Sequence, residues 1–315
     1  MSFVLSQKHV HEFQQKILLW YETHKRPLPW RETHDPYKIL VSEIMSQQTQ
    51  ISRVVPKYEA WIDALPTVEA LAQAPVSTVL ALWSGLGYNR RALFLQKAAQ
   101  VIVQTYGGTF PETVDQLEKL PGIGTYTASA VACFAFNAQI PVIDTNIRKV
   151  ILVHFGAISN NSHSGKRVKR AHPESFVSVG DKSDPGLRQD DEKTYTMTDK
   201  EIEETAWILL PAGKAYVWNQ ALMDYSGAEL KAHKIPIPKQ SKLLGSDRYY
   251  RGQTLKLLIS NQELRSMNHV TVHTVLDYFR NLGHPIELER LEKILKGMEK
   301  EGFIVRKQDT ILLPD

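Results

Sequence analysis

One segment constrains the fold of this chain more than any other: residues 117–136, which read LEKLPGIGTYTASAVACFAF. An apolar helix is expected to end at Leu120, a PGIG turn follows, and a second helix is expected to begin at Thr125. Glycine at 122 and 124 permits backbone conformations closed to other residues and lets another backbone approach closely. The N–H groups of the turn and of the following helix would then form an anion site. The segment predicts a helix-hairpin-helix that grips one DNA phosphate; an ordinary helical corner is the alternative.

Helical periodicity continues through most of the chain. Asp35 followed by Pro36 predicts a helix start. Pro56 is expected to divide the next apolar pattern into one helix that ends near Arg53 and another that runs to about Leu65. Further helices are expected at 67–74, 76–83, 90–106, 112–119, 125–136, 145–155, 199–210 and 215–231. The predicted fold class is therefore all-α.

Changes in composition divide the chain into parts. Residues 158–199 are polar and charged, which predicts an exposed insertion within a core that spans 1–230. Residues 231–246 contain KIPIPKQSK and predict a linker. Residues 247–315 predict a small module of three helical stretches and a two-strand hairpin turning at 307–309, a pattern typical of a winged helix.

The overall composition is that of a globular protein with a basic balance. A formal net charge of +4 permits a polyanionic partner without requiring one. The only cysteine, Cys133, excludes an internal disulfide and any multi-cysteine metal site. No apolar run approaches the roughly 20 residues that span a bilayer, and no signal-peptide core opens the sequence. We therefore expect a cytoplasmic, nucleoid-associated monomer with no membrane partner.

Two acids flank the hairpin in the sequence. Glu43 lies in VSEIMSQQTQ, residues 41–50, and Asp144 lies in PVIDTNIRKV. Each has an ordinary interpretation when taken alone, because a helix glutamate is usually solvated and an aspartate before a helix is usually an N-cap. The order of the parts (acid helix, hairpin, then aspartate on the next helix) favours a joint role instead.

A set of motifs in fixed order carries a resemblance to a known family. The motifs are LPW at 28–30, SEIMSQQTQ at 42–50, LWSGLGYNRRA at 82–92, GGTFPET at 107–113, LPGIGTYTA at 120–128, DTNIRKV at 144–150 and NQALMD at 219–224. Together they resemble the helix-hairpin-helix DNA glycosylases, and among these the MutY adenine glycosylases. The resemblance covers roughly residues 10–157 and 200–230, and it implies a two-lobed helical core.

The resemblance implies catalytic roles for four residues. Glu43 would protonate the departing adenine and Asp144 would lie across the sugar, while Tyr126 and Asn146 would support the charge stabilisation. These roles suit the chemistry, since breaking an N-glycosidic bond needs one carboxyl that donates a proton and another that offsets positive charge on the sugar. We expect burial to raise the pKa of Glu43 and the helix start to keep Asp144 ionised.

The resemblance also implies residues that bind the substrate. Positions that line the adenine pocket are matched by Trp30, Arg31, Ile51 and Gln220. Residues that push into the base stack while the adenine is extruded are matched by Gln48 and Tyr88. Further expected DNA contacts are Thr49, Gly122, Ile123, Gly124 and Thr125. Core packing is the alternative interpretation for Trp30, Ile51 and Tyr88. The family hairpin can also coordinate a monovalent cation, here through the carbonyls of Glu118, Leu120 and Ile123.

The sequence departs from the family in two places. Most members carry four cysteines that hold an iron–sulfur cluster after the NQALMD segment, and this stretch contains no cysteine, so we expect no cluster. Ordinary packing by Trp207, Trp218, Leu222 and Met223 is expected to close these helices instead, and the basic cluster at 166–170 is either an added DNA contact or part of a solvated loop. Residues 247–315 do not resemble the Nudix-like domain that reads 8-oxoguanine in the family.

The implied function is a monofunctional DNA glycosylase that removes adenine mispaired with 8-oxoguanine or guanine from double-stranded DNA and leaves an abasic site. Tyr126 stands where glycosylase-lyases carry a lysine nucleophile, which argues against Schiff-base chemistry. Two alternatives stay open. One is a mismatch thymine or uracil glycosylase of the same superfamily, and the other is a non-catalytic DNA-binding relative that would have no need for both acids.

Overall fold

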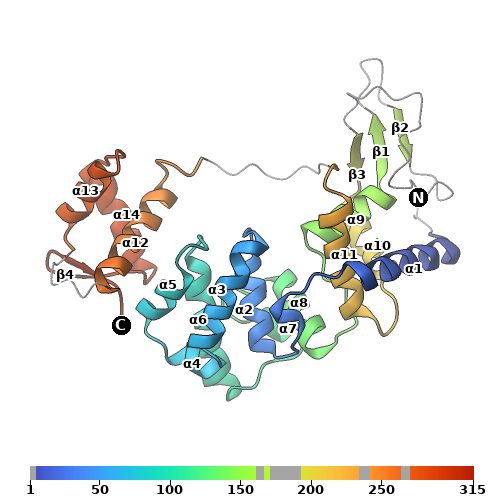
Figure 1. Ribbon diagram of the computed structural model, residues 1–315, viewed down its shortest axis with the longest axis horizontal. Helices are drawn as coiled ribbons and strands as arrows, with labels where there is room; N and C mark the ends of the chain where they lie inside the picture. The colour runs from blue at the N-terminus through green and yellow to red at the C-terminus, as the bar shows by residue number, and fades with distance from the viewer. Residues whose placement is uncertain (1–4, 161–166, 171–192, 234–241, 264–269) are drawn as a thin grey trace. The chain divides into compact units, whose positions relative to one another are not determined.

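The computed structural model describes residues 5–160, 167–170, 193–233, 242–263 and 270–315 (Figure 1). Most regular structure in these residues is helical, which confirms the predicted all-α class with a small C-terminal sheet. The chain divides into two compact units. Unit 1 comprises Met1–Pro36, Glu112–Val114 and Gly124–Pro238, and unit 2 comprises Tyr37–Pro111, Asp115–Ile123 and Lys239–Asp315.

The predicted domain boundaries at 230 and 247 stay a prediction. Part of the predicted linker, residues 234–241, lies outside the described residues. No helix among the described residues is both long enough and apolar enough to cross a membrane.

Unit 1 contains helices, and the apolar faces of four of them meet in one core. The helices are α1 (Gln7–His24), η1 (Pro29–Arg31), α8 (Thr125–Phe136), α9 (Thr145–Phe155), α10 (Asp199–Leu209) and α11 (Ala215–Glu229). The four that share the core are α1, α9, α10 and α11. Both α1 and α9 pack against α11. Phe13 of α1 meets Trp218 of α11 edge-on, with ring centroids 6.0 Å apart. This core holds α9, and with it Asp144, in a fixed position.

Four side chains were expected to pack together where most family members hold an iron–sulfur cluster. The expectation is correct for three of them and wrong for one. Trp218 and Leu222 are buried and Met223 packs against the same core, but the Trp207 side chain is 49% exposed. The inward positions of α10 are Ile202, Thr205, Ala206 and Leu209. Their spacing follows one helix face, and residue 207 therefore lies on the opposite side.

Three short strands lie within the predicted insertion or at its border, where no strand was expected. They are β1 (Ala157–Asn160), β2 (Arg167–Arg170) and β3 (Lys193–Thr196), and they form an antiparallel sheet in the order β2-β1-β3. The predicted exposed insertion therefore contains regular strand structure at these residues, which the sequence analysis did not predict. Charged residues in β2 and β3 concealed the strands, because a sheet pairs through its backbone. Residues 161–166 and 171–192 lie outside the described part of the chain.

Unit 2 begins with a group of packed helices. They are α2 (Pro36–Ser46), α3 (Ile51–Ala64), α4 (Val68–Gln73), α5 (Val76–Trp83), α6 (Arg90–Tyr106) and the end of the one-turn α7 (Val114–Leu117). Trp61 and Trp83 meet edge-on at 5.6 Å in the core. Trp61 also donates to the hydroxyl of Tyr37, which in turn donates to the carbonyl of Leu65. These contacts fix α2, which carries Glu43.

Pro56 does not divide a helix as expected. It lies inside the continuous helix α3, and the break comes earlier, at residues 47–50 between α2 and α3. Gln48 has a φ of 52° in this break. A left-handed residue cannot continue a right-handed helix, so Gln48 and not the proline sets the boundary.

The C-terminal part of unit 2 is a small α+β module. Its helices are α12 (Asp247–Glu263), α13 (Val272–Asn281) and α14 (Leu288–Lys300), followed by the hairpin of β4 (Val305–Lys307) and β5 (Thr310–Leu312). Thr271 forms an antiparallel bridge with Thr310, so the segment before α13 joins the hairpin. This order of three helices and a terminal hairpin confirms the predicted winged-helix-like pattern.

Candidate active site and DNA interface

The hairpin turn requires glycine at position 122, because of both its backbone conformation and its close neighbour. Gly122 has a φ of 76°, and a methyl group added there would lie 2.5 Å from the Cβ of Phe94. The turn is closed by hydrogen bonds from the N–H of Leu120 to the carbonyl of Leu117 and from Ile123 to the carbonyl of Leu120. A larger residue at 122 would be strained and would collide with α6.

The helix after the turn has no side-chain cap. α8 begins at Thr125, as predicted, and its N-cap is Gly124, which has no side chain to accept a hydrogen bond. The first N–H groups of a helix have no partner within the helix. Gly122, Gly124 and Thr125 are also exposed. This arrangement is suited to an anion such as a DNA phosphate.

Asp144 caps helix α9 and is tightly held. One carboxylate oxygen accepts the N–H of Ile147 at 2.7 Å, and the other accepts the side-chain amide of Asn146 at 2.6 Å. The pKa of Asp144 is nevertheless raised, because loss of water outweighs the hydrogen bonds that favour the charged form. The ordinary N-cap interpretation is correct as a description of the geometry. A further role in chemistry is compatible with it.

Glu43 lies half-buried on α2 between the buried residues Ser42 and Ile44. It belongs to unit 2, whereas Asp144 belongs to unit 1. Of the other predicted site residues, Gln48, Thr49, Ile51, Tyr88, Gly122 and Ile123 are in unit 2, and Trp30, Arg31, Gly124, Thr125, Tyr126, Asn146 and Gln220 are in unit 1. Tyr126 is half-buried on the first turn of α8. The predicted catalytic pair is thus divided between the units.

Arg31 is engaged with a buried carboxylate that the sequence analysis overlooked. Its two terminal nitrogens donate to the carboxylate oxygens of Asp224 at 2.7 and 2.9 Å. Arg26 donates to the same carboxylate from its backbone and its side chain. These partners hold the pKa of Asp224 below its usual value despite burial, which opposes ionisation. Asp224 therefore positions the loop that carries Arg31 and the buried Trp30.

Asn219, also in the NQALMD segment, holds the backbone of residues 140–142 that leads to Asp144. Asn219 accepts the N–H of Val142 at 2.8 Å and donates to the carbonyls of Ile140 and Ala215. It also lies 3.4 Å from the sulfur of Cys133, whose pKa burial raises to about 11. Within this motif the sequence predicted a site role for Gln220 alone, and Gln220 is buried on α11. Its neighbours Asn219 and Asp224 hold the surrounding backbone in place.

The two residues predicted to enter the base stack share an unusual backbone conformation. Gln48 and Tyr88 have φ values of 52° and 47°, and both side chains are exposed. Non-glycine residues with positive φ are uncommon and concentrate at functional sites. The flanking Gly85 and Gly87 also have positive φ. Each side chain is therefore presented on a tight, strained loop, whereas the core-packing alternative for Tyr88 is wrong.

Arg91 joins these two loops and was not recognised as a candidate from the sequence. Its guanidinium donates to the carbonyls of Ile44, Met45 and Gln47 at the end of α2. On the other side it donates to the carbonyls of Leu86 and Gly87. The same group lies over the rings of Trp83 and Tyr88. Burial lowers the pKa of Arg91 to about 10. The only signal in the sequence was its place in the LWSGLGYNRRA motif.

The remaining candidates are partly supported. The hydroxyl of Thr49 is 3.3 Å from Arg91, so it belongs to the same loop network. Ile51 is half-buried at the start of α3. The carbonyl of Leu120, one of three expected to bind a cation, already accepts the N–H of Ile123. A second lone pair stays available on that oxygen, and the cation site stays a prediction.

Comparison with known proteins finds a family model that matches part of the chain. Residues 41–173 match the family described as HhH-GPD superfamily base excision DNA repair protein. This segment contains the hairpin and all four predicted catalytic residues. Residues 41–173 of this chain are therefore similar to the HhH-GPD superfamily. Within that superfamily the chain is similar to adenine DNA glycosylases, as the motif resemblance predicted.

Several curated adenine DNA glycosylases match the chain over part of their length. The protein of Mycolicibacterium smegmatis is 50% identical over 137 residues, which cover 43% of this chain and 47% of that protein. The Mycobacterium tuberculosis protein is 44% identical over 142 residues, 45% of this chain and 47% of that protein. The human protein is 40% identical over 148 residues, 44% of this chain and 27% of that protein. The match thus spans less than half of the length of these curated relatives.

Two solved structures have a fold similar to that of most of this chain. A thermostable thymine-DNA glycosylase is 28% identical with a TM-score of 0.54, and the match covers 75% of this chain and 91% of that one. A trapped endonuclease III–DNA covalent intermediate is 17% identical with a TM-score of 0.53, covering 76% and 95%. The second likeness supports the fold alone.

Proposed function

We propose that this chain is a monofunctional DNA glycosylase that removes adenine mispaired with 8-oxoguanine or guanine from double-stranded DNA, acting as a monomer. One observation carries the proposal. Residues 41–173, which match the base excision repair family, contain Glu43, the hairpin and Asp144 in the expected order, and the chain is 40–50% identical to adenine DNA glycosylases over part of its length.

The proposed chemistry divides the work between the two acids. As the N-glycosidic bond breaks, its electron pair leaves with the adenine and Glu43 gives that base a proton. The positive charge that develops on the sugar is offset by Asp144, and water then completes the hydrolysis. The hydrogen bonds from Ile147 and Asn146 support this role, because they favour the charged carboxylate.

The proposed binding of DNA uses three surfaces. The exposed hairpin turn and the uncapped start of α8 grip one phosphate. Gln48 and Tyr88 enter the base stack as the adenine leaves it. Arg91 holds both loops through hydrogen bonds to the carbonyls of Gln47 and Gly87. The proposed contacts of the extruded base, taken from the motif resemblance, are Trp30, Arg31, Ile51 and Gln220. No iron–sulfur cluster is part of this proposal, because the chain contains a single cysteine.

Base release from a panel of duplexes tests the proposal. Each duplex carries adenine, thymine or uracil opposite guanine or 8-oxoguanine, and abasic sites are counted after alkaline cleavage. We expect release of adenine only. Release of thymine or uracil without adenine would instead support the second candidate, which the 28% identity to a thymine-DNA glycosylase favours. Binding without release of any base would make the chain a non-catalytic relative.

A further inference from the structure

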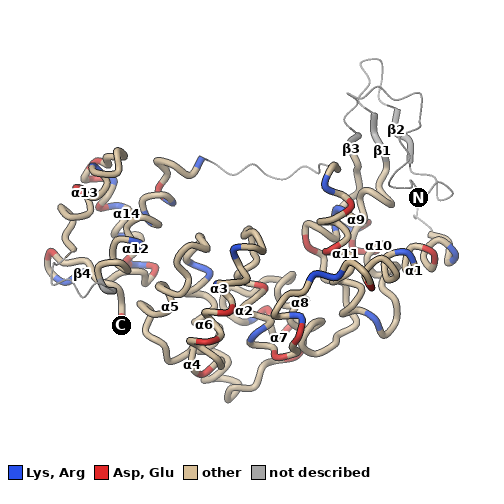
Figure 2. Tube along the Cα trace, in the orientation of Figure 1, with Lys and Arg blue, Asp and Glu red and all other residues tan. Residues whose placement is uncertain are grey.

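The C-terminal module has almost balanced charge, with eleven lysines and arginines against ten acids in residues 247–315. Basic and acidic residues occur side by side along it (Figure 2). Net charge therefore says little about a partner. What the structure adds is which of these charges are already neutralised by a neighbour and which are not.

Arginines of the module pair with four of its acids, Asp247, Asp277, Glu292 and Glu301. Arg290 pairs with Asp247 at 2.7 Å and Arg251 pairs with Glu301 at 2.6 Å. Arg306 holds Glu292 with two hydrogen bonds, at 2.8 and 3.2 Å. Its backbone N–H also donates to Glu299. Both flanking acids of α14 are thus directed toward the β-hairpin.

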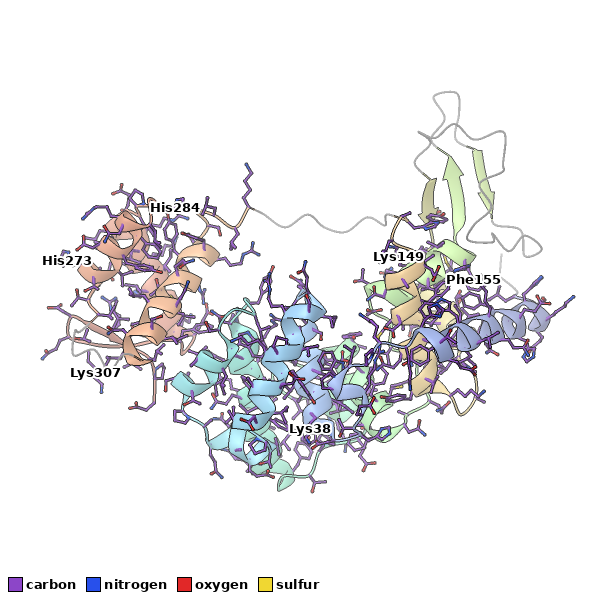
Figure 3. All side chains as sticks on the ribbon, in the orientation of Figure 1. Lys38, Lys149, Phe155, His273, His284 and Lys307 are labelled. Atoms are coloured by element: carbon purple, nitrogen blue, oxygen red, sulfur yellow. The ribbon has the colours of Figure 1, made fainter. Side chains whose placement is uncertain are left out.

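The lysines of α14 have no such acidic partner among the described residues. Lys293, Lys296 and Lys300 are exposed, and within the described part of the chain none of them forms an ion pair or a hydrogen bond. Their spacing of three and four residues places them on one face of α14, opposite the buried Leu291, Leu295 and Met298. Lys307, exposed on the hairpin, adds a fourth unpaired cation (Figure 3).

The lysine face contains a glycine that packing does not require. Gly297 lies between Lys296 and Lys300 inside α14, and an added methyl group there would meet no atom within 4 Å. Glycine inside a helix costs roughly 0.5–1 kcal/mol relative to alanine. A residue that weakens the free helix without any internal contact is consistent with a surface that another molecule approaches closely.

The module also contacts the loop predicted to enter DNA. Arg248 of α12 donates to the hydroxyl of Tyr88 at 2.8 Å and lies over its ring. Arg90 reaches Glu301, which Arg251 also holds. The carbonyl of Pro314 accepts the N–H of Ser77 at the start of α5. These contacts link the module to the part of unit 2 that carries Tyr88.

We propose that the module is a second DNA-contacting surface, in which Lys293, Lys296 and Lys300 bind phosphates of the duplex. The inference rests on the proposed function in taking DNA as the substrate. From the first to the last of these lysines the helix rises about 10 Å, which matches the axial spacing of about three phosphates of one strand. In helix-turn-helix proteins the second helix of the pair likewise contacts DNA, and α14 occupies that place after α13.

Binding at several salt concentrations tests the inference. The full-length protein, with Lys293, Lys296 and Lys300 all replaced by alanine, is titrated with a duplex that contains an A:8-oxoguanine pair and with the same duplex without it. We expect weaker binding to both duplexes and a salt slope that is smaller by about two to three. The matched control removes three other exposed lysines, Lys8, Lys200 and Lys256, and should leave the slope close to that of the original protein.

A second variant separates charge from folding. Arginine at 293, 296 and 300 keeps the charge and should keep the slope, whereas a merely structural role for lysine would make both triple variants fail alike. A slope equal to the control's in the alanine variant overturns the inference. The proposed function is tested separately, by base release from the unaltered protein. If that protein releases no base from any duplex while the salt slope of the alanine variant still falls, the lysine surface is supported and the glycosylase activity is refuted.

Discussion

At the scale of single residues, Asp144 shows how one side chain can serve structure and proposed chemistry together. Its role as a helix cap was readable from the sequence, because an aspartate before an amphipathic helix has few other uses. The raised pKa was not readable, since it comes from burial of the carboxyl in the folded protein. A carboxylate that burial disfavours is costly to keep ionised, and this gives a test.

We predict that Asp144→Asn loses most base release but does not lose stability. Asparagine caps a helix as well as aspartate does, so α9 stays closed. Because the folded pKa is raised, the carboxylate destabilises the fold as pH rises from the unfolded pKa through the folded pKa, and asparagine removes this effect at neutral pH. Thermal unfolding and single-turnover release should be measured together, with Asp63→Asn as an exposed control. A lower melting temperature with normal release would leave Asp144 as a cap only.

Arg91 illustrates what sequence reasoning misses at this scale. An arginine at a helix start is usually a surface residue, and nothing local distinguishes Arg91 from its neighbour Arg90. Only the fold brings the end of α2 and the loop before α6 to the same guanidinium. We infer that Arg91 positions the strained residues Gln48 and Tyr88 and does not touch the adenine.

Arg91→Lys should therefore lower both stability and activity. Lysine keeps the charge but cannot bridge several carbonyls at once, and we expect a loss of about 2 kcal/mol or more in the free energy of unfolding. Base release should fall more steeply than DNA affinity, because the phosphate contacts stay intact. Arg90→Lys, at the exposed neighbouring position, serves as the control. Arg91→Lys with normal stability and release would show that the bridge is dispensable.

At the scale of elements, helix punctuation in the sequence was informative. The bounds expected for α5, α6, α8 and α9 agree with the structure, because glycines, prolines and caps mark those ends. Two features of the elements were not predicted from the sequence. The break after α2 depends on the left-handed Gln48, which no propensity predicts, and the strands at 157–160, 167–170 and 193–196 depend on pairing between segments far apart in the chain.

Helix α9 should make the fold sensitive to acid through His154. Burial lowers the pKa of His154 to about 4, with smaller effects from Lys16 and His233. Between pH 6.5 and 4 the unfolded chain binds a proton that the folded chain does not, so the free energy of unfolding falls as pH falls through this window. The loss should amount to a few kcal/mol, at roughly 1.4 kcal/mol for each pKa unit.

His154→Leu should remove most of this acid sensitivity. Denaturant titrations at pH 7 and pH 4.5 give the difference for the variant and the original protein, and replacement of the exposed His273 by leucine is the control (Figure 3). An unchanged difference in His154→Leu would assign the acid sensitivity to other groups.

At the scale of the whole molecule, the sequence predicted the similarity of residues 41–173 to the HhH-GPD superfamily, the fold class and the winged-helix-like order of the last part. The motifs that carried this prediction lie within the parts of the chain that pack closely. The contacts between α12 and the Tyr88 loop were not predictable, because ion pairs such as Arg90 with Glu301 leave no pattern in the sequence.

The whole protein should leave abasic sites without breaking the strand. By resemblance, Tyr126 stands where glycosylase-lyases carry lysine, so we expect no Schiff base at this position. The product duplex should break only after alkali or heat. Trapping with borohydride should give no stoichiometric covalent adduct, and such an adduct would contradict the monofunctional mechanism.

The most direct test is single-turnover release of adenine from an A:8-oxoguanine duplex by the Glu43→Gln variant. Glutamine keeps the size of the side chain but has no proton to give, so we expect release to be abolished while DNA affinity stays close to that of the original protein. Glu59→Gln, on the exposed side of α3, should release adenine normally. Release by Glu43→Gln near the original rate would show that Glu43 is not the acid and that the proposed mechanism is wrong.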